Sequence, residues 1–229
     1  MRKENSMIEC TDLGKSYRKY VLFSDSTFGF RAQKVSFVMG PNGCGKTSLL
    51  KCLFGLEGFA GSIGFDGKDV SQVRKDCLVM WDGVFMYPNL SGLQNLLLFS
   101  DARKQTVRDA AETFLSGDVL KRKLKHYSTG QNKKLGLALV ELCQPKYLAI
   151  DELSSGLDYE SLVALKPVVQ RWKQSMTLIL TGHQFNFYNA LVDDLYIFKD
   201  QKIELYAQDW RPEEGALEDV YDEEIIAKR

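Results

Sequence analysis

Residues 40 to 48 place three glycines, a lysine and a threonine at a spacing suited to phosphate binding. The stretch reads Gly40-Pro41-Asn42-Gly43-Cys44-Gly45-Lys46-Thr47-Ser48. It matches the pattern G-x-x-x-x-G-K-[ST], in which backbone N–H groups cradle a polyphosphate. Lys46 can reach the outer phosphates, and the Thr47 hydroxyl is a hard oxygen ligand suited to Mg²⁺. A purely structural glycine turn would not need this Lys-Thr pair, so we predict that all nine residues belong to a nucleotide site.

Two carboxylates follow a buried apolar run later in the chain. Asp151 and Glu152 come directly after residues 147–150, which we expect to form a central parallel strand. Such charges are costly when unpaired, and the carboxyl ends of parallel strands are where open α/β sheets bind ligands. We therefore interpret Asp151 and Glu152 as functional residues and not as two solvent-exposed charges at a strand end. Asp151 is predicted to hold Mg²⁺, and Glu152 to polarise the water that attacks the γ-phosphate.

The elements around these residues predict an α/β fold. Apolar runs at 35–39 and 177–181 read as buried strands, and a helix is expected after Lys46. Several short strands between residues 7 and 30, with another at 61–67, predict a small antiparallel sheet at the N-terminal side. Helical spacing from 91 to 143, with Ser91 as N-cap, predicts a helical insertion over about 84–145.

The C-terminal part is expected to stay with this one domain of residues 1–229. A hairpin is predicted around the turn at 199–202. The tail over about 208–229 is acidic, and Leu217, Val220, Tyr221 and Ile225 are spaced like one face of a helix. We expect this helix to pack on the domain.

The composition limits the binding partners and the cellular compartment that we expect. Thirty basic and thirty acidic residues balance among the 229, and 45% of the residues are hydrophobic. The chain thus has no general field for attracting nucleic acid or an anionic membrane. The N-terminus lacks a signal-peptide pattern, and we expect no membrane-spanning helix. Five cysteines without a C-x-x-C pair favour a reducing, cytosolic compartment, and Cys44, near a helix N-terminus, is expected to favour a thiolate.

With these motifs the sequence resembles the ATP-binding cassette family, the nucleotide-binding subunits of membrane transporters. The resemblance covers nearly the whole chain, in the family's motif order. The matching segments are Tyr17, the phosphate loop, Tyr127-Ser128-Thr129-Gly130-Gln131, Ile150-Asp151-Glu152, Ser155-Gly156-Leu157-Asp158 and His183.

The resemblance implies an ATPase that uses ATP and Mg²⁺ and has a P-loop core with a parallel sheet, an N-terminal antiparallel subdomain and a helical insertion. Tyr17 would stack on adenine, Lys46, Glu152 and His183 would serve catalysis, and Ser128, Gly130 and Gln131 would contact ATP held by a second subunit.

The implied assembly is a head-to-tail homodimer or heterodimer that drives a separate transmembrane permease. It would lie in the cytoplasm, peripheral to the inner face of the cell membrane, without a nucleic-acid partner. The apolar residues at 84–87 and 90 lie where the family docks its permease, although they could equally fill the insertion's own core. The short length and the tail at 217–221 favour export.

The residue types at 128–134 also suggest phosphate binding without reference to the family. Ser128 can cap the helix that follows, and Gly130 allows close approach of an anion. Lys133 and Lys134 lie in the first turn of that helix, where positive charge opposes the helix dipole. A phosphate arriving from outside would offset that conflict, whereas a purely structural cap would leave the lysines unexplained.

Three positions depart from the family pattern. Asp82 stands where a glutamine is usual, and an ionised carboxylate only accepts hydrogen bonds. About 4 Å from a phosphate charge it would be repelled by on the order of 4 kcal/mol at an effective dielectric of 20. Asp82 is therefore expected either to coordinate Mg²⁺ or to point away from the phosphates. We hypothesise that this substitution slows ATP hydrolysis. Thr129 and Leu153 replace a glycine and a proline and are expected to be tolerated.

Two alternatives remain open from the sequence. One is a cassette that binds ATP with little hydrolysis, to which Asp82 adds weight. The other is a soluble cassette ATPase outside transport, which would normally show a second cassette, a coiled-coil arm or a basic surface.

Overall fold

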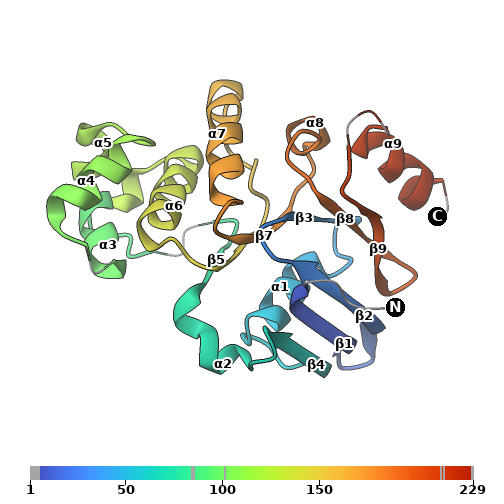
Figure 1. Cartoon of the computed structure of the whole chain (residues 1–229). Coiled ribbons are helices and arrows are strands. Elements are labelled where there is room, and N and C mark those ends of the chain that lie inside the picture. Colours follow the sequence, from blue (N-terminus) through green and yellow to red (C-terminus); the bar gives the residue numbers. More distant parts are fainter. Residues whose placement is uncertain (1–5, 84–85, 101, 212, 214, 228–229) are drawn as a thin grey trace.

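The computed structural model describes residues 6–83, 86–100, 102–211, 213 and 215–227. Within these ranges two β-sheets are combined with helices (Figure 1). The strands are β1 (Ser6–Tyr17), β2 (Tyr20–Arg31), β3 (Val35–Met39), β4 (Ala60–Phe65), β5 (Cys77–Met80), β6 (Tyr147–Ile150), β7 (Thr177–Thr181), β8 (Asp194–Lys199) and β9 (Lys202–Gln208).

The helices fall between these strands and after the last one. They are α1 (Lys46–Leu53), α2 (Val70–Val73), α3 (Gly92–Phe99), α4 (Lys104–Glu112), α5 (Gly117–Lys121), α6 (Thr129–Cys143), α7 (Tyr159–Trp172), α8 (Phe185–Tyr188) and α9 (Leu217–Tyr221). Short 3₁₀ turns cover Arg74–Asp76 and Leu124–His126, and a π-helical turn covers Asp222–Ile226.

The central sheet has the order β5-β6-β7-β3-β8-β9, and only its last pair, β8 with β9, is antiparallel. The strands predicted at 35–39, 147–150 and 177–181 are confirmed with the same bounds. All three are buried along their whole length, which explains their continuous apolar sequence. Because β3, β6 and β7 run parallel, the loops that follow them meet at one edge of the sheet.

The second sheet is antiparallel, with the order β2-β1-β4, as predicted. The prediction of several short strands between residues 7 and 30 was wrong, because the structure has two continuous strands of 12 residues. Register shifts interrupt the pairing of β1 with β2, and Asp12 and Asp25 have positive φ. These irregularities break the regular alternation of side chains and make each strand look like several pieces in the sequence.

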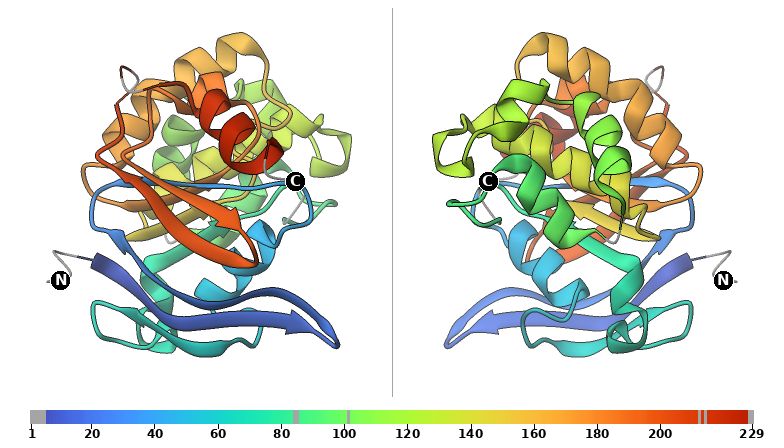
Figure 2. Two further views of the ribbon diagram at one scale, coloured as in Figure 1. Left: turned by 90° about the vertical axis from the view of Figure 1, so that its right-hand side faces the viewer. Right: turned by 90° about the vertical axis from the view of Figure 1, so that its left-hand side faces the viewer.

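The molecule is layered, with the antiparallel sheet on one side of the central sheet and helices on the other (Figures 1 and 2). Helix α1 lies between the two sheets, where Leu49, Leu50 and Leu53 join one apolar core. The opposite face of the central sheet packs against α7, α8 and α9 in a second core.

Helices α3 to α6 form a group between β5 and β6 in the chain, beside the end of the central sheet (Figure 1). They share an apolar cluster of their own, which includes Leu96, Val107 and Leu139. Ser91 caps α3 as predicted: its side chain accepts from the Gln94 N–H, and Gln94 accepts from the Ser91 N–H.

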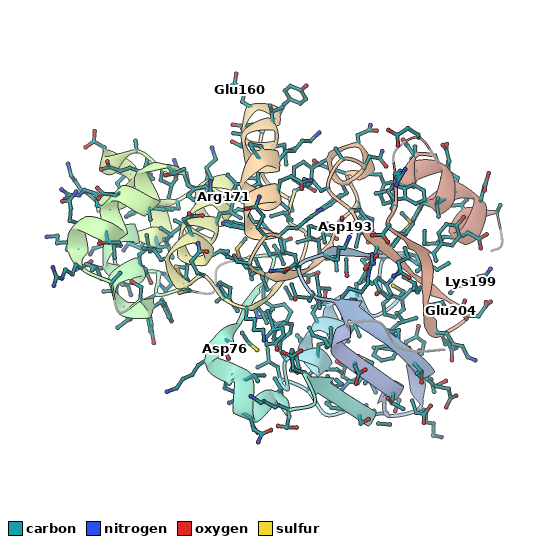
Figure 3. The ribbon with its side chains drawn as sticks, viewed as in Figure 1. Asp76, Glu160, Arg171, Asp193, Lys199 and Glu204 are labelled. Atoms are coloured by element: carbon teal, nitrogen blue, oxygen red, sulfur yellow. The ribbon has the colours of Figure 1, made fainter. Side chains whose placement is uncertain are left out.

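The C-terminal segment packs on the domain as expected. Leu217, Val220 and Ile225 are buried in the core that contains α7 and α8. Lys199, labelled at the end of the β8–β9 hairpin in Figure 3, forms an ion pair with Glu224 at 2.9 Å. In the part of the chain that is described, no helix has the length and apolarity needed to span a bilayer.

Candidate nucleotide site

The loop at 40–45 joins β3 to α1 and favours glycine at three positions, two because of the backbone conformation and one because of the space available. Gly43 and Gly45 have φ of 78° and 116°, in the left-handed region. A Cβ added at Gly40 would lie 2.7 Å from Cys44 Sγ and 2.8 Å from the Phe198 Cβ. The three glycines therefore allow the tight turn that precedes the first turn of α1.

A cleft of about 360 Å³ opens beside this loop. The described residues that line it are Tyr17, Leu22, Asn42, Gly43, Gly45, Lys46, Thr47, Ser48, Asp151 and Glu152. Pro41 and Cys44 line an adjoining hollow of about 260 Å³ that shares Leu22, Asn42 and Gly43 with the cleft. The structure thus brings the predicted phosphate loop and the predicted carboxylates to one place, although they are more than 100 residues apart in the sequence.

The Lys46 side chain is buried against its own loop. Its ammonium donates to the carbonyl oxygens of Gly40 at 2.7 Å and Pro41 at 3.2 Å. Its Nζ also lies 3.5 Å from His183 Nε2. The ammonium is therefore held at the point where the loop, the end of β7 and the carboxylates converge.

Asp151 is held by two hydroxyl groups. Thr47 Oγ1 donates to one carboxylate oxygen at 2.7 Å, and Thr181 Oγ1 donates to the other at 2.6 Å. Thr181 also accepts from the Glu152 N–H at 3.0 Å. The sequence reasoning missed Thr181, whose only signal was its place at the end of a buried strand.

Glu152 and His183 face each other across the end of the sheet. Glu152 Oε1 lies 3.3 Å from His183 Nε2, and Glu152 has a left-handed backbone with φ of 52°. Burial raises the pKa of Glu152, which Lys46 partly offsets, whereas burial and then Lys46 lower the pKa of His183. Both shifts favour the neutral form of each side chain, because both groups are partly withdrawn from solvent.

Tyr17 lies at the end of β1 with nearly half of its side chain exposed. Its hydroxyl donates to Glu57 and lies 3.3 Å from Ser48 Oγ. Lys15 Nζ lies 4.5 Å from the centroid of the Tyr17 ring, and Lys15 also pairs with Glu57 at 3.1 Å. These contacts fix the ring at the rim of the cleft.

Ser128, Gly130 and Gln131 lie at the start of α6, and the structure does not place them among the residues lining the cleft of their own chain. Ser128 accepts from the Gln131 N–H at 3.2 Å, and the Gln131 side chain accepts from the Ser128 N–H at 3.1 Å. A Cβ at Gly130 would lie 2.5 Å from the Gly156 carbonyl oxygen. Gly130 is therefore needed for close contact between the start of α6 and the loop at 155–158.

The sequence suggested that Lys133 needs a phosphate from outside the chain to offset its position in the first turn of the helix. The structure gives it partners within the chain instead. Its side chain is 3% exposed, and its ammonium donates to Glu152 O at 2.8 Å and to Asp151 O at 3.3 Å. The same ammonium pairs with Asp82 Oδ1 at 3.3 Å. Partners within the chain therefore account for this lysine.

Asp82 takes the second of its two expected positions and turns away. It lines a small hollow of about 90 Å³ beside Lys133, together with Thr129 and Asn132. Asp82 is not among the described residues that line the cleft, so the structure does not place it as a metal ligand. Leu153, the other departure beside the carboxylates, is fully buried in the core that the central sheet shares with α7, α8 and α9.

The expectation that Cys44 favours a thiolate was wrong. Burial raises the pKa of the Cys44 thiol, and Lys46 only partly opposes that rise. The N-terminus of α1 therefore does not outweigh the loss of solvent around the sulfur.

Comparison with known proteins agrees with this geometry. The family model described as ABC transporter matches residues 23–155 of the chain. The lantibiotic transport ATP-binding protein SrtF of Streptococcus pyogenes is 27% identical over 230 residues, covering 97% of this chain and 99% of that protein. The Fe(3+) ions import ATP-binding protein FbpC of Mannheimia succiniciproducens is 25% identical, covering 90% of this chain and 64% of that protein.

Among solved structures, an ATP-binding subunit of an ABC transporter superposes with a TM-score of 0.79 at 21% identity. That match covers 95% of this chain and 93% of the other. The fold is thus that of an ABC ATPase, with an antiparallel subdomain beside a mostly parallel sheet. The chain belongs to the ABC transporter family. It is an ATP-binding subunit whose ATP hydrolysis is coupled to transport through a membrane permease.

Proposed function

We propose that the chain binds Mg²⁺-ATP in the cleft beside the phosphate loop and hydrolyses it there. The observation that carries the proposal is that this one cleft is lined by residues 42–48 together with Asp151 and Glu152. Lys46 would exchange its contacts with the Gly40 and Pro41 carbonyls for phosphate oxygens. Tyr17, at the rim, offers the aromatic surface for the adenine base.

The oxygen donors in the cleft fit Mg²⁺. Thr47 and Asp151 offer a hydroxyl and a carboxylate that already lie 2.7 Å apart. Among the described residues, no group of three or more His, Cys, Asp or Glu side chains could hold a metal alone. This fits Mg²⁺, which commonly uses one or two protein ligands together with substrate phosphates and water. When bound, the ion would neutralise charge on the phosphates.

Glu152 and His183 are the residues that we propose for the chemical step. The Glu152 carboxylate lies at the end of the cleft, where it can orient and polarise the attacking water. His183, 3.3 Å from that carboxylate, would hold the water and the outermost phosphate in place. Most of the rate would come from positioning and charge stabilisation.

The proposal includes a head-to-tail dimer, either of two copies or with a related cassette. Ser128 is exposed, Gly130 and Gln131 are partly exposed, and all three stand apart from the cleft of their own chain. A second subunit could therefore receive their hydroxyl and backbone N–H groups on its bound nucleotide. The N-terminus of α6, a helix of 15 residues, adds a favourable field for phosphate.

We propose that the dimer lies on the cytoplasmic face of the membrane and contacts its permease near Tyr87, in a transport system that exports. Val84 and Phe85 of the predicted apolar patch lie outside the described residues. Of the rest, Met86 is buried in the core of the insertion, whereas Tyr87 is 54% exposed. Tyr87 stacks on Phe99 with ring centroids 5.9 Å apart, which presents an apolar surface beside α3.

Glu152→Gln is the variant that tests this function. The amide removes the base and keeps the size of the side chain, so ATP binding should persist while phosphate release falls by on the order of 10² or more. The variant should form a dimer with ATP and Mg²⁺, detected by light scattering, and Lys46→Ala should lose nucleotide binding. A wild-type rate for Glu152→Gln, or a monomer under these conditions, would contradict the proposal.

A further inference from the structure

Lys133 connects three parts of the molecule through one buried ammonium group. It lies on α6, one turn after Gly130, and its side chain is 3% exposed. Its three partners are Asp82 Oδ1 at 3.3 Å, Asp151 O at 3.3 Å and Glu152 O at 2.8 Å. An ammonium has three donors, and these three acceptors use all of them.

The backbone that Lys133 contacts carries the carboxylate proposed for Mg²⁺, Asp151, and the one proposed to polarise water, Glu152. Neighbouring strands already hold its N–H groups, because Asp151 N donates to Met80 O at 2.8 Å and Glu152 N donates to Thr181 Oγ1 at 3.0 Å. Lys133 holds the carbonyl groups of the same two residues. The central sheet and helix α6 therefore fix opposite sides of one short segment.

This segment needs such support because Glu152 has φ of 52°. A left-handed backbone is unfavourable for a residue with a Cβ, and it persists where the surroundings determine it. The shortest of the three Lys133 contacts is the one to the Glu152 carbonyl. The ammonium therefore opposes relaxation of this residue and with it a change in the direction of the Glu152 side chain.

Asp82 is the third partner and keeps its charge outside the nucleotide cleft. Its side chain is 44% exposed, and it lines the small hollow at the start of α6. The loop after β5, the start of α6 and the end of β6 thus meet at one ion pair.

We propose that Lys133 is a positioning residue for ATP hydrolysis, which fixes the backbone of Asp151 and Glu152 and links their position to that of helix α6. This inference rests on the proposed role of Glu152 in the chemical step. A shift of α6 when residues 128–131 meet the second subunit's nucleotide would then reach Glu152 through one side chain. Lys133 itself need not touch ATP.

Lys133→Met tests the proposal because methionine keeps an unbranched apolar stem and removes the ammonium. We expect kcat to fall by about 10- to 100-fold, as for supporting residues of other catalytic centres. The affinity for a fluorescent ATP analogue should stay at the wild-type value, because the phosphate loop is unchanged. Lys104→Met, an exposed lysine on α4, is the matched control and should leave both quantities unchanged.

Asp82→Asn separates positioning from simple charge neutralisation. Asparagine still accepts a hydrogen bond from Lys133, so this variant should hydrolyse ATP near the wild-type rate. The double variant Asp82→Asn with Lys133→Met should remain as slow as Lys133→Met, because the carbonyl contacts are lost in both. Recovery of the wild-type rate in the double variant would show that Lys133 only neutralises Asp82 and would overturn the inference.

Two further results would overturn it. One is a wild-type kcat in Lys133→Met, and the other is a loss of nucleotide affinity in parallel with kcat and with the melting temperature. Glu152→Gln is measured beside these variants so that the two proposals fail separately. If wild type hydrolyses ATP, Glu152→Gln does not, and Lys133→Met is normal, the proposed function stands and only the role of Lys133 is refuted.

Discussion

The Thr181 hydroxyl donates to the Asp151 carboxylate at 2.6 Å from the strand beside the one that Asp151 follows. The same oxygen accepts the Glu152 N–H. One hydroxyl group therefore orients the carboxylate proposed for Mg²⁺ and the backbone of the residue proposed to polarise water. The arrangement depends on β6 and β7 being parallel neighbours, since only then do their ends meet.

Replacing Thr181 by valine removes this hydroxyl at almost constant volume. We expect ATP hydrolysis to fall by about 10- to 100-fold, with a higher Mg²⁺ concentration needed for half-maximal rate, because Asp151 loses a donor and Glu152 N loses its acceptor. Phosphate release over a Mg²⁺ titration measures both effects. Thr181→Ser keeps the hydroxyl and should stay close to wild type; an unchanged Mg²⁺ dependence in Thr181→Val would contradict the role.

Gly130→Ala should damage the contact between the start of α6 and the loop at 155–158. The added Cβ would lie 2.5 Å from Gly156 O, so the backbone must shift. A displacement of this kind can cost on the order of 10² in rate when it moves a catalytic group. Light scattering of Glu152→Gln with and without Gly130→Ala should show a weaker ATP-induced dimer. Gly64→Ala is the control, because its Cβ meets only Gly67 Cα at 3.9 Å.

The sequence was sufficient for those parts of the fold and site that depend on contiguous residues. The strands at 35–39, 147–150 and 177–181 are apolar throughout because both faces of the sheet are covered, so their bounds could be predicted. The phosphate loop likewise has its glycines, lysine and threonine in one stretch. The two long strands β1 and β2 could not be predicted, because bulges interrupt their alternation.

The residues that support the site could be identified only from the structure. Thr181 and Lys133 belong to no sequence motif. Thr181 reaches Asp151 because β6 and β7 are neighbours, and Lys133 reaches Glu152 because of where α6 lies. The helix dipole suggested that Lys133 needs a phosphate from outside the chain. In the structure its ammonium donates to the carbonyl groups of Asp151 and Glu152. For Asp82, sequence reasoning left two positions open, and in the structure its carboxylate pairs with Lys133.

Arg31 joins the antiparallel sheet to the central sheet, and its loss should destabilise the protein strongly. Its guanidinium donates to Asp194 Oδ2 at 2.9 Å and to Asp209 Oδ2 at 3.1 Å, and Asp194 is fully buried. Arg31→Met leaves a buried carboxylate uncompensated, which should cost about 3 to 5 kcal/mol in the free energy of unfolding. Urea denaturation measures this value. Lys121→Met, which breaks an exposed pair with Asp118, should barely change the midpoint.

Acidification should destabilise the protein partly through Asp209. Arg31, followed by Lys34, holds the pKa of Asp209 well below its usual range. Because the folded carboxylate binds protons less readily than the unfolded one, its contribution is present above the ordinary pKa of about 3.9 and is lost as pH falls below it. Asp209→Asn should therefore lose less stability than wild type between pH 5 and pH 3, measured as the shift in urea midpoint. Equal shifts would contradict this assignment.

The thiol of Cys44 should react slowly although it belongs to the phosphate loop. Burial raises its pKa, so little thiolate is present near pH 7.5, whereas Cys143 is exposed on the surface. Iodoacetamide labelling followed by mass spectrometry should modify Cys143 first, and the rate at Cys44 should rise steeply with pH. ATP should slow the labelling of Cys44 further, because the loop that holds the sulfur would close around phosphate, and should leave Cys143 unaffected. Labelling of Cys44 as fast as that of Cys143, or at the same rate with and without ATP, would contradict this account of the loop.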